Sequence, residues 1–135
     1  MGNILMGDDG ISIYILKRIK DRLEDMNIKV FIVETDINFL IDIVEENDIL
    51  IIVDALLSKG KVGSVNVFKP MMNKVSFCHS YIPWHIILNK AKEVFEIGIE
   101  VENIEFKIGL GKALEDKIDD IADDVLNSIK KLSIH

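Results

Sequence analysis

Cysteine is nearly absent from this chain, which has Cys78 alone among its 135 residues. A single cysteine excludes a disulfide bond within the chain and fits a protein of the reducing cytoplasm. Lysine and arginine are also few, with 16 basic residues against 23 acidic ones and a formal net charge of −7. This charge argues against nucleic acid or an anionic membrane as the main partner, because both attract basic surfaces.

Long apolar runs are missing as well. The longest ones, such as Ile49–Val53, are far shorter than a membrane span, and the N-terminus does not have the pattern of a secretory signal. The chain has no Walker-type loop and no GxGxxG, HExxH or GxSxG motif. Hydrophobic residues nevertheless make up 49% of the sequence, so we expect one folded cytoplasmic domain over residues 1–135.

Helical periodicity marks two long segments. Apolar residues recur every three or four positions after Gly10 and predict a helix that ends near Asn27. A similar apolar stripe over Leu114–Leu132 predicts a long closing helix. Shorter helices are expected at Phe39–Glu46 and Pro83–Phe95.

The β-strands are expected between these helices. Ile49–Val53 is apolar without alternation, which is typical of a strand that is covered on both faces. Ser64–Phe68 and Lys74–Phe77 are too close together for an intervening helix and predict an antiparallel hairpin. Further strands are expected at Ile28–Val33 and Ile104–Ile108. The fold class is therefore α/β, a three-layer α/β/α sandwich with a mixed, mostly parallel sheet.

Two adjacent acids near the N-terminus, Asp8 and Asp9, lie between two glycines just before the first helix. In the simpler interpretation, one of them caps that helix while the glycines form the turn. In the functional interpretation, one caps the helix and the other points into a cleft. Asp54 directly follows the expected strand Ile49–Val53, and ligands of open α/β sheets bind at the carboxyl ends of strands. In a parallel sheet these acids can converge on one edge.

His79 is the candidate third member of this group, in a loop beside Cys78. The two are a poor nucleophile and base pair, because neighbours on an extended chain point to opposite sides. Two carboxylates and an imidazole form a donor set that zinc, nickel and iron accept. The residues thus indicate a metal site as one hypothesis.

The segment Gly2–Ile11 closely resembles the signature of the [NiFe]-hydrogenase maturation endopeptidases. These proteins trim the C-terminal extension from the nickel-loaded precursor of the hydrogenase large subunit. The resemblance covers nearly the whole chain and continues through Ile51–Ala55, Lys61–Val65, His79 and Ile108–Leu110.

This resemblance implies that Asp9, Asp54 and His79 are both the catalytic residues and the metal ligands. Nickel is implied as the metal, supplied with the substrate, and zinc could take its place in vitro. The family has no serine or cysteine nucleophile of its own, so a metal-polarised carbonyl or bound water is the natural route to cleavage. The implied partner is the large-subunit precursor, without nucleic acid or membrane, and the implied enzyme is a monomer.

Two departures from the family pattern matter. The family has an apolar strand before the motif, whereas this chain starts inside it, so we expect the first strand to be truncated and the true N-terminus to lie upstream of Met1. The family also has a glycine-rich turn where this chain has Val33–Asn38 without glycine. A catalytically inactive relative that binds the precursor without cutting it is therefore one alternative.

A receiver-like signalling domain is the other alternative. Asp8, Asp9, Asp54 and either Lys107 or Lys112 imitate the acids and the lysine of such phospho-acceptor domains. A receiver domain needs a helix after its phospho-acceptor strand, however, and a hairpin is expected there instead. The protease interpretation is therefore preferred.

Overall fold

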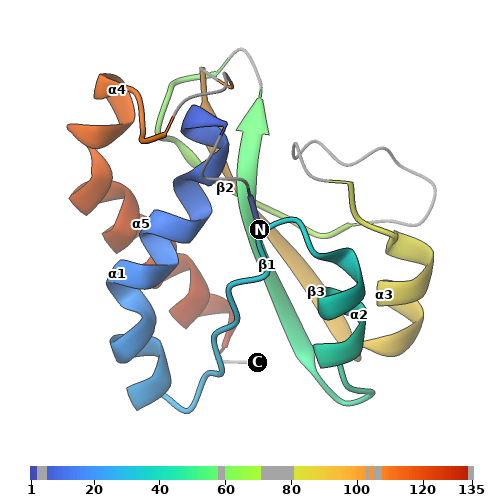
Figure 1. The fold of residues 1–135 in the computed structure, drawn as a ribbon. Coiled ribbons are helices and arrows are strands. Elements are labelled where there is room, and N and C mark those ends of the chain that lie inside the picture. Colours follow the sequence, from blue (N-terminus) through green and yellow to red (C-terminus); the bar gives the residue numbers. More distant parts are fainter. Residues whose placement is uncertain (3–5, 58–59, 71–80, 103, 105–107, 134–135) are drawn as a thin grey trace.

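The computed structural model describes residues 1–2, 6–57, 60–70, 81–102, 104 and 108–133. Its elements, in chain order, are η1 (Gly7–Gly10, a 3₁₀ helix), α1 (Ile11–Asp25), α2 (Ile37–Ile43), β1 (Ile49–Leu57), β2 (Val65–Phe68), α3 (Trp84–Lys90), β3 (Glu93–Val101), α4 (Lys112–Glu115) and α5 (Ile118–Leu132). Helices α1 and α5 cover one face of the sheet, and α2 and α3 cover the other (Figure 1). The expected three-layer α/β/α architecture is confirmed.

The sheet is mixed, as expected, with the strand order β1-β3-β2. The central strand β3 pairs in parallel with β1, where Val53 lies opposite Ile97, and antiparallel with β2, where Val67 lies opposite the same residue. The described partner of β2 is therefore β3. The expected hairpin partner of β2, residues 74–77, lies outside the described residues.

The central strand was not expected from the sequence. A helix was predicted over Pro83–Phe95, but α3 ends at Lys90 and Ala91 already has an extended backbone (φ −80°, ψ 152°). From Glu93 the chain alternates its side chains between the two faces of the sheet, a strand pattern rather than a helical one. A strand was also predicted at Ile104–Ile108. The described residues of this range are Ile104 and Ile108, and neither lies in a strand, so the prediction is wrong there.

Three other boundaries also differ from the prediction. Ile28–Val33 forms no strand, although its composition favours one, because a strand needs a neighbour with which to pair. Helix α2 begins two residues early because the Asp36 side chain accepts a hydrogen bond of 3.0 Å from the Phe39 amide and caps it. It ends at Ile43 rather than at the predicted Glu46, and Val44 already has an extended backbone. The closing helix is divided into α4 and α5.

Two apolar cores hold the layers together. The larger core lies between the sheet and helices α1 and α5, and includes Ile15, Ile97 and Val125. The smaller core lies between the sheet and helices α2 and α3, and includes Leu40 and Ile87. Because both faces of the sheet are covered, the middle of the sheet is rigidly packed. No described helix is long and apolar enough to cross a membrane.

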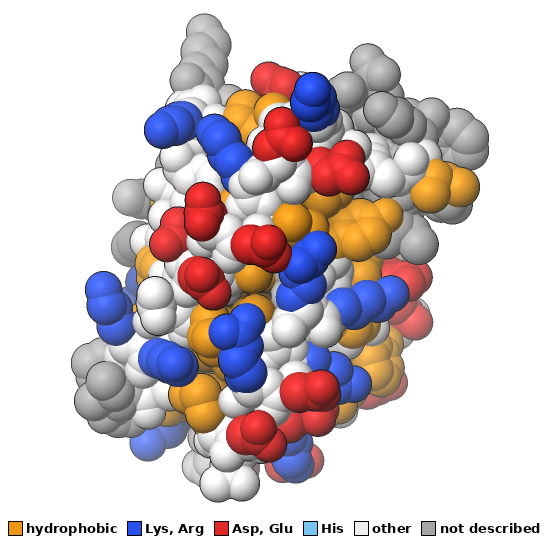
Figure 2. Space-filling view, turned by 90° about the vertical axis from the view of Figure 1, so that its left-hand side faces the viewer, with side chains coloured by type: hydrophobic (Ala, Val, Ile, Leu, Met, Phe, Trp, Pro, Cys, Tyr) orange, Lys and Arg blue, Asp and Glu red, His pale blue; other side chains and the backbone are white. Residues whose placement is uncertain are grey.

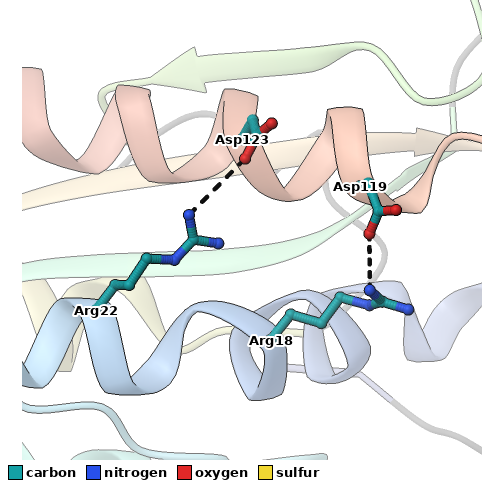
Figure 3. A network of polar contacts seen from close by, with 4 residues as sticks. All are labelled: Arg18, Arg22, Asp119 and Asp123. Atoms are coloured by element: carbon teal, nitrogen blue, oxygen red, sulfur yellow. Dashed lines mark hydrogen bonds and ion pairs between the residues drawn. The ribbon is translucent and has the colours of Figure 1, made fainter.

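Acidic and basic side chains are interspersed on the face of the molecule shown in Figure 2. Two arginines of α1 approach two aspartates of α5, with Arg18 at 2.7 Å from Asp119 and Arg22 at 3.9 Å from Asp123 (Figure 3). The four side chains are between 49% and 84% exposed, so water competes with each ion pair.

These ion pairs are expected to contribute little to stability. We predict that Arg18→Ala lowers the free energy of unfolding by less than about 1 kcal/mol, because exposed salt bridges are well screened. Urea denaturation at low and at high salt measures this effect. A larger loss that disappears at high salt would mean that the two helices depend on these charges.

Candidate active site

The N-terminal motif is anchored to β1 by the first residues of the chain. The amino group of Met1 donates a hydrogen bond of 2.6 Å to the Val53 carbonyl, and the Gly2 amide donates one of 2.9 Å to the Glu34 carbonyl. The hydroxyl of Ser12, in the first turn of α1, donates to the Met1 carbonyl. Gly2 has a φ of +144°, and a Cβ there would overlap the carbonyl oxygen of Asp9. This close approach requires glycine and brings the motif against β1.

Asp8 connects the motif to the far end of the chain. Its side chain is 1% exposed, and its Oδ1 accepts a hydrogen bond of 2.7 Å from the Gly111 amide. Gly111 directly precedes α4, so this bond joins the first loop to the last one. The sequence could not show this partner of Gly111, which lies 103 residues away in the chain.

Asp9 and Asp54 are both buried, with 4% and 0% of their surfaces exposed. They belong to η1 and β1, two elements that contact each other. The expectation that an acid of the motif caps α1 is wrong, because the N-cap residue is Gly10. Both acids of the motif are instead enclosed by the protein, where an ionised carboxylate is costly unless a cation or hydrogen bonds compensate it.

The position of Asp54 also differs from the prediction. It was expected just after the end of a strand, but β1 continues to Leu57 and Asp54 lies inside it, opposite Gly98 of β3. Its Oδ1 accepts a hydrogen bond of 2.8 Å from the Ala55 amide, which fixes the orientation of the carboxylate. Asp54 is therefore held within β1, where the strand is paired with β3, rather than in a loop.

Two further acids share this face of the sheet and were missed by the sequence analysis. Glu96 and Glu100 flank Gly98 at two residues on either side, and they are only 3% and 8% exposed. Since Gly98 pairs with Asp54, all three carboxylates point to the same side. Their alternation with Ile97 and Ile99 is the signal that could have identified both the strand and this acidic face.

The third expected ligand, His79, lies outside the described residues, as do Cys78 and Lys107. Within the described part of the chain, no three histidine, cysteine, aspartate or glutamate side chains are grouped so that they could hold one metal ion. Two of the three predicted ligands, Asp9 and Asp54, are therefore described, and they lie on elements that contact each other. Carboxylate oxygens are among the ligands that zinc accepts in proteins.

The receiver-like alternative is not supported by the topology. A receiver domain needs a helix after the strand that carries the phospho-acceptor. Between β1 and β2, the described residues 60–64 contain no helix. The strand after β1 is also antiparallel to its neighbour.

Comparison with solved structures shows proteins of the same fold. The hydrogenase maturating endopeptidase HybD from E. coli is 22% identical with a TM-score of 0.71, over 96% of this chain and 88% of that one. The [NiFe] hydrogenase maturation protease HybD from Thermococcus kodakarensis is 20% identical with a TM-score of 0.70, over 93% of each chain. An endopeptidase from Escherichia coli is 23% identical with a TM-score of 0.72, over 97% and 89%.

Sequence comparisons alone give no relative, since neither a family model nor a curated protein matches. In each comparison the structural likeness extends over nearly the full length of both chains. The chain therefore has the fold of the [NiFe]-hydrogenase maturation endopeptidases.

Proposed function

We propose that this protein is an endopeptidase that removes the C-terminal extension of a nickel-loaded [NiFe]-hydrogenase large-subunit precursor. In this proposal Asp9, Asp54 and His79 bind the nickel that the substrate carries. The shared fold supports a protease of this class, and the N-terminal sequence motif supports the assignment of the residues.

The burial of Asp9 and Asp54 on contacting elements is the observation that carries the proposal. Burying a carboxylate opposes folding, because the charged group loses its hydration. Acids in such an arrangement are expected where a cation or a reaction requires them. Asp8 differs, because the Gly111 amide gives it a structural role as the link between two loops.

The roles of these residues follow from their chemistry. Carboxylate oxygens from Asp9 and Asp54 and an imidazole nitrogen from His79 would complete the ligands of the nickel in the precursor. A metal held in this way polarises a neighbouring peptide carbonyl or a bound water. The protein supplies orientation, since Asp54 is fixed by the sheet and Asp9 by the backbone packing around Gly2.

Exposed apolar side chains near this end of the sheet suit the binding of a peptide. Leu57, at the end of β1, is 55% exposed, and Ile108, three residues before Gly111, is 77% exposed. A contiguous patch of exposed apolar side chains is a candidate for contact with a partner, and in this proposal Leu57 and Ile108 would belong to such a patch. They would receive the segment of the precursor around the scissile bond.

Nickel dependence tests this proposal directly. We expect the purified protein to shorten a nickel-loaded precursor and to leave the nickel-free precursor intact, because the metal is needed to complete the site. Mass spectrometry of the precursor before and after incubation measures the loss of the C-terminal extension.

Two outcomes would contradict the proposal. Equal cleavage of both precursors would show that nickel has no part in recognition. A stable complex with the nickel-loaded precursor and no loss of mass would identify an inactive binding relative instead. Zinc added to the nickel-free precursor serves as a control for a general divalent-metal effect.

A further inference from the structure

The loop before α4 holds the N-terminal motif by a hydrogen bond. The Gly111 amide donates this bond, of 2.7 Å, to Oδ1 of Asp8, the residue before the candidate ligand Asp9. Helix α4 and the start of α1 lie at the same end of the molecule (Figure 1). Asp8 is 1% exposed, so little water competes for its carboxylate.

The element that carries Asp9 has little stability of its own. η1 is a 3₁₀ helix of four residues, and no side chain caps its start. The Asp9 amide donates a hydrogen bond of 3.2 Å to the Met6 carbonyl. Short 3₁₀ turns have poor hydrogen-bond geometry, and a single helical turn is not stable alone in water. Contacts with the rest of the protein therefore set the position of η1.

Two contacts outside η1 restrain consecutive residues of the motif. The Asp9 carbonyl packs so closely against Gly2 that a Cβ at that glycine would lie 2.2 Å from the carbonyl oxygen. The Asp8 carboxylate is bonded to Gly111. Because the peptide between Asp8 and Asp9 is planar and stiff, a shift of Asp8 also moves Asp9.

The loop that provides the Gly111 amide is itself firmly anchored. Leu110 packs against the larger core, and Leu114 belongs to that core with 0% exposure. Further along the chain, Nζ of Lys117 donates a hydrogen bond of 3.2 Å to the Val62 carbonyl, in the connection between β1 and β2. The segment 111–117 therefore joins the motif to the connection that follows β1, the strand of the second candidate acid.

We propose that Asp8 and Gly111 are positioning residues for the metal ligand Asp9, and that their hydrogen bond sets the place of the Asp9 carboxylate relative to β1. This inference rests on the proposed metal role of Asp9. Ligand side chains have to be held within about 0.5 Å of their productive geometry. Loss of a group that orients a ligand typically weakens metal binding by about 10–100-fold. Asp8 acts through Asp9 and is not itself a ligand.

Two substitutions of Gly111 separate the hydrogen bond from the loop that provides it. Gly111 has a φ of −64°, which proline and alanine both adopt. Gly111→Pro lacks the amide hydrogen and places a ring carbon there, so the bond to Asp8 is lost. Gly111→Ala keeps the donor. Its Cβ would lie 3.2 Å from Oδ1 of Asp8, a contact that a shift of a few tenths of an ångström relieves.

Two substitutions of Asp8 separate the hydrogen bond from the charge. Asp8→Ala and Asp8→Asn both remove the negative charge, but only asparagine keeps an oxygen that accepts from the Gly111 amide. The difference between these two variants therefore reports the loss of the acceptor.

Zinc titration calorimetry of the purified protein measures the effect on the ligand. We expect the zinc Kd to rise by about 10–100-fold in Gly111→Pro and Asp8→Ala, and by less than about threefold in Gly111→Ala and Asp8→Asn. The double variant Asp8→Ala with Gly111→Pro should bind zinc no more weakly than Asp8→Ala alone, because the bond is already lost. Equal affinities in all variants, or additive losses in the double variant, would overturn the proposal.

A core variant tests whether a general loss of stability explains any weaker binding. Ile129 is 3% exposed in the larger core, toward the end of α5 that is farthest along the chain from α4. Ile129→Ala is expected to lower the urea midpoint of unfolding and to leave the zinc Kd within about threefold, because the site is distant. Zinc affinity that falls with stability in every variant, Ile129→Ala included, would contradict a positioning role.

Amide hydrogen exchange separates this inference from the proposed function, because it needs no metal. We expect the Asp9 amide to exchange about tenfold or more faster in Gly111→Pro than in Gly111→Ala, since η1 has the same sequence in both and only its support differs. Faster exchange in a protein that binds no zinc would confirm that Gly111 holds the motif and contradict the metal role of Asp9. Equal exchange with unchanged zinc affinity would keep the metal site and overturn the positioning role.

Discussion

Asp54→Asn is expected to abolish cleavage of the nickel-loaded precursor while the protein remains folded. The substitution removes the negative charge that would bind the metal, and the loss of several kcal/mol of transition-state stabilisation corresponds to about 10²–10⁴-fold in rate. The amide oxygen of asparagine can still accept the hydrogen bond from the Ala55 amide. Cleavage rates from mass spectrometry and the circular dichroism spectrum together measure this effect.

Asp8→Asn is the matched control for this variant. Asp8 is as buried as Asp54, but its Oδ1 accepts from the Gly111 amide, and asparagine can keep this bond. We expect it to retain most of the cleavage activity. Equal losses in the two variants would mean that any neutralised buried acid disturbs the site, and Asp54 would have no special role.

The second large effect is expected at Ile97, the residue of β3 that lies opposite both Val53 and Val67. Its side chain is 0% exposed and belongs to the larger core. We predict that Ile97→Ala lowers the free energy of unfolding by about 2–5 kcal/mol, because the cavity cannot be filled without shifts in the central strand. Urea denaturation with a two-state fit measures the loss.

Ile108→Ala provides the comparison, because Ile108 is 77% exposed. The same change of side chain there is expected to alter stability by less than about 0.5 kcal/mol. Similar losses at the two positions would contradict the assignment of β3 as the central strand. The pair therefore also tests the part of the fold that the sequence analysis missed.

The elements with regular local patterns were predictable from the sequence. The stripe of apolar residues after Gly10 predicted α1, and the unbroken apolar run predicted the start of β1. In β3, by contrast, Glu96 and Glu100 interrupt the apolar residues, and the preceding apolar segment suggested a longer helix. The segment forms a strand because it pairs with β1 and β2, and pairing is not a local property.

The burial of the candidate acids could be anticipated from the sequence, but the contacts that hold them could not. Adjacent acids between glycines indicated Asp8 and Asp9, and an acid at the end of an apolar run indicated Asp54; all three are buried. The strand extends past Asp54 because Ala55, Leu56 and Leu57 pair with β3, which depends on residues more than 40 positions later. The bond between Asp8 and Gly111 is likewise formed between distant segments.

The convergence of Asp9, Asp54 and His79 on one metal ion is the central claim, and a crystal structure of the protein soaked with nickel or zinc tests it most directly. The proposal predicts a single ion with an oxygen of each aspartate and a nitrogen of the histidine at about 2.0–2.3 Å. Carboxylates that point to different sides of the sheet, or an ion bound without Asp9 and Asp54, would contradict it.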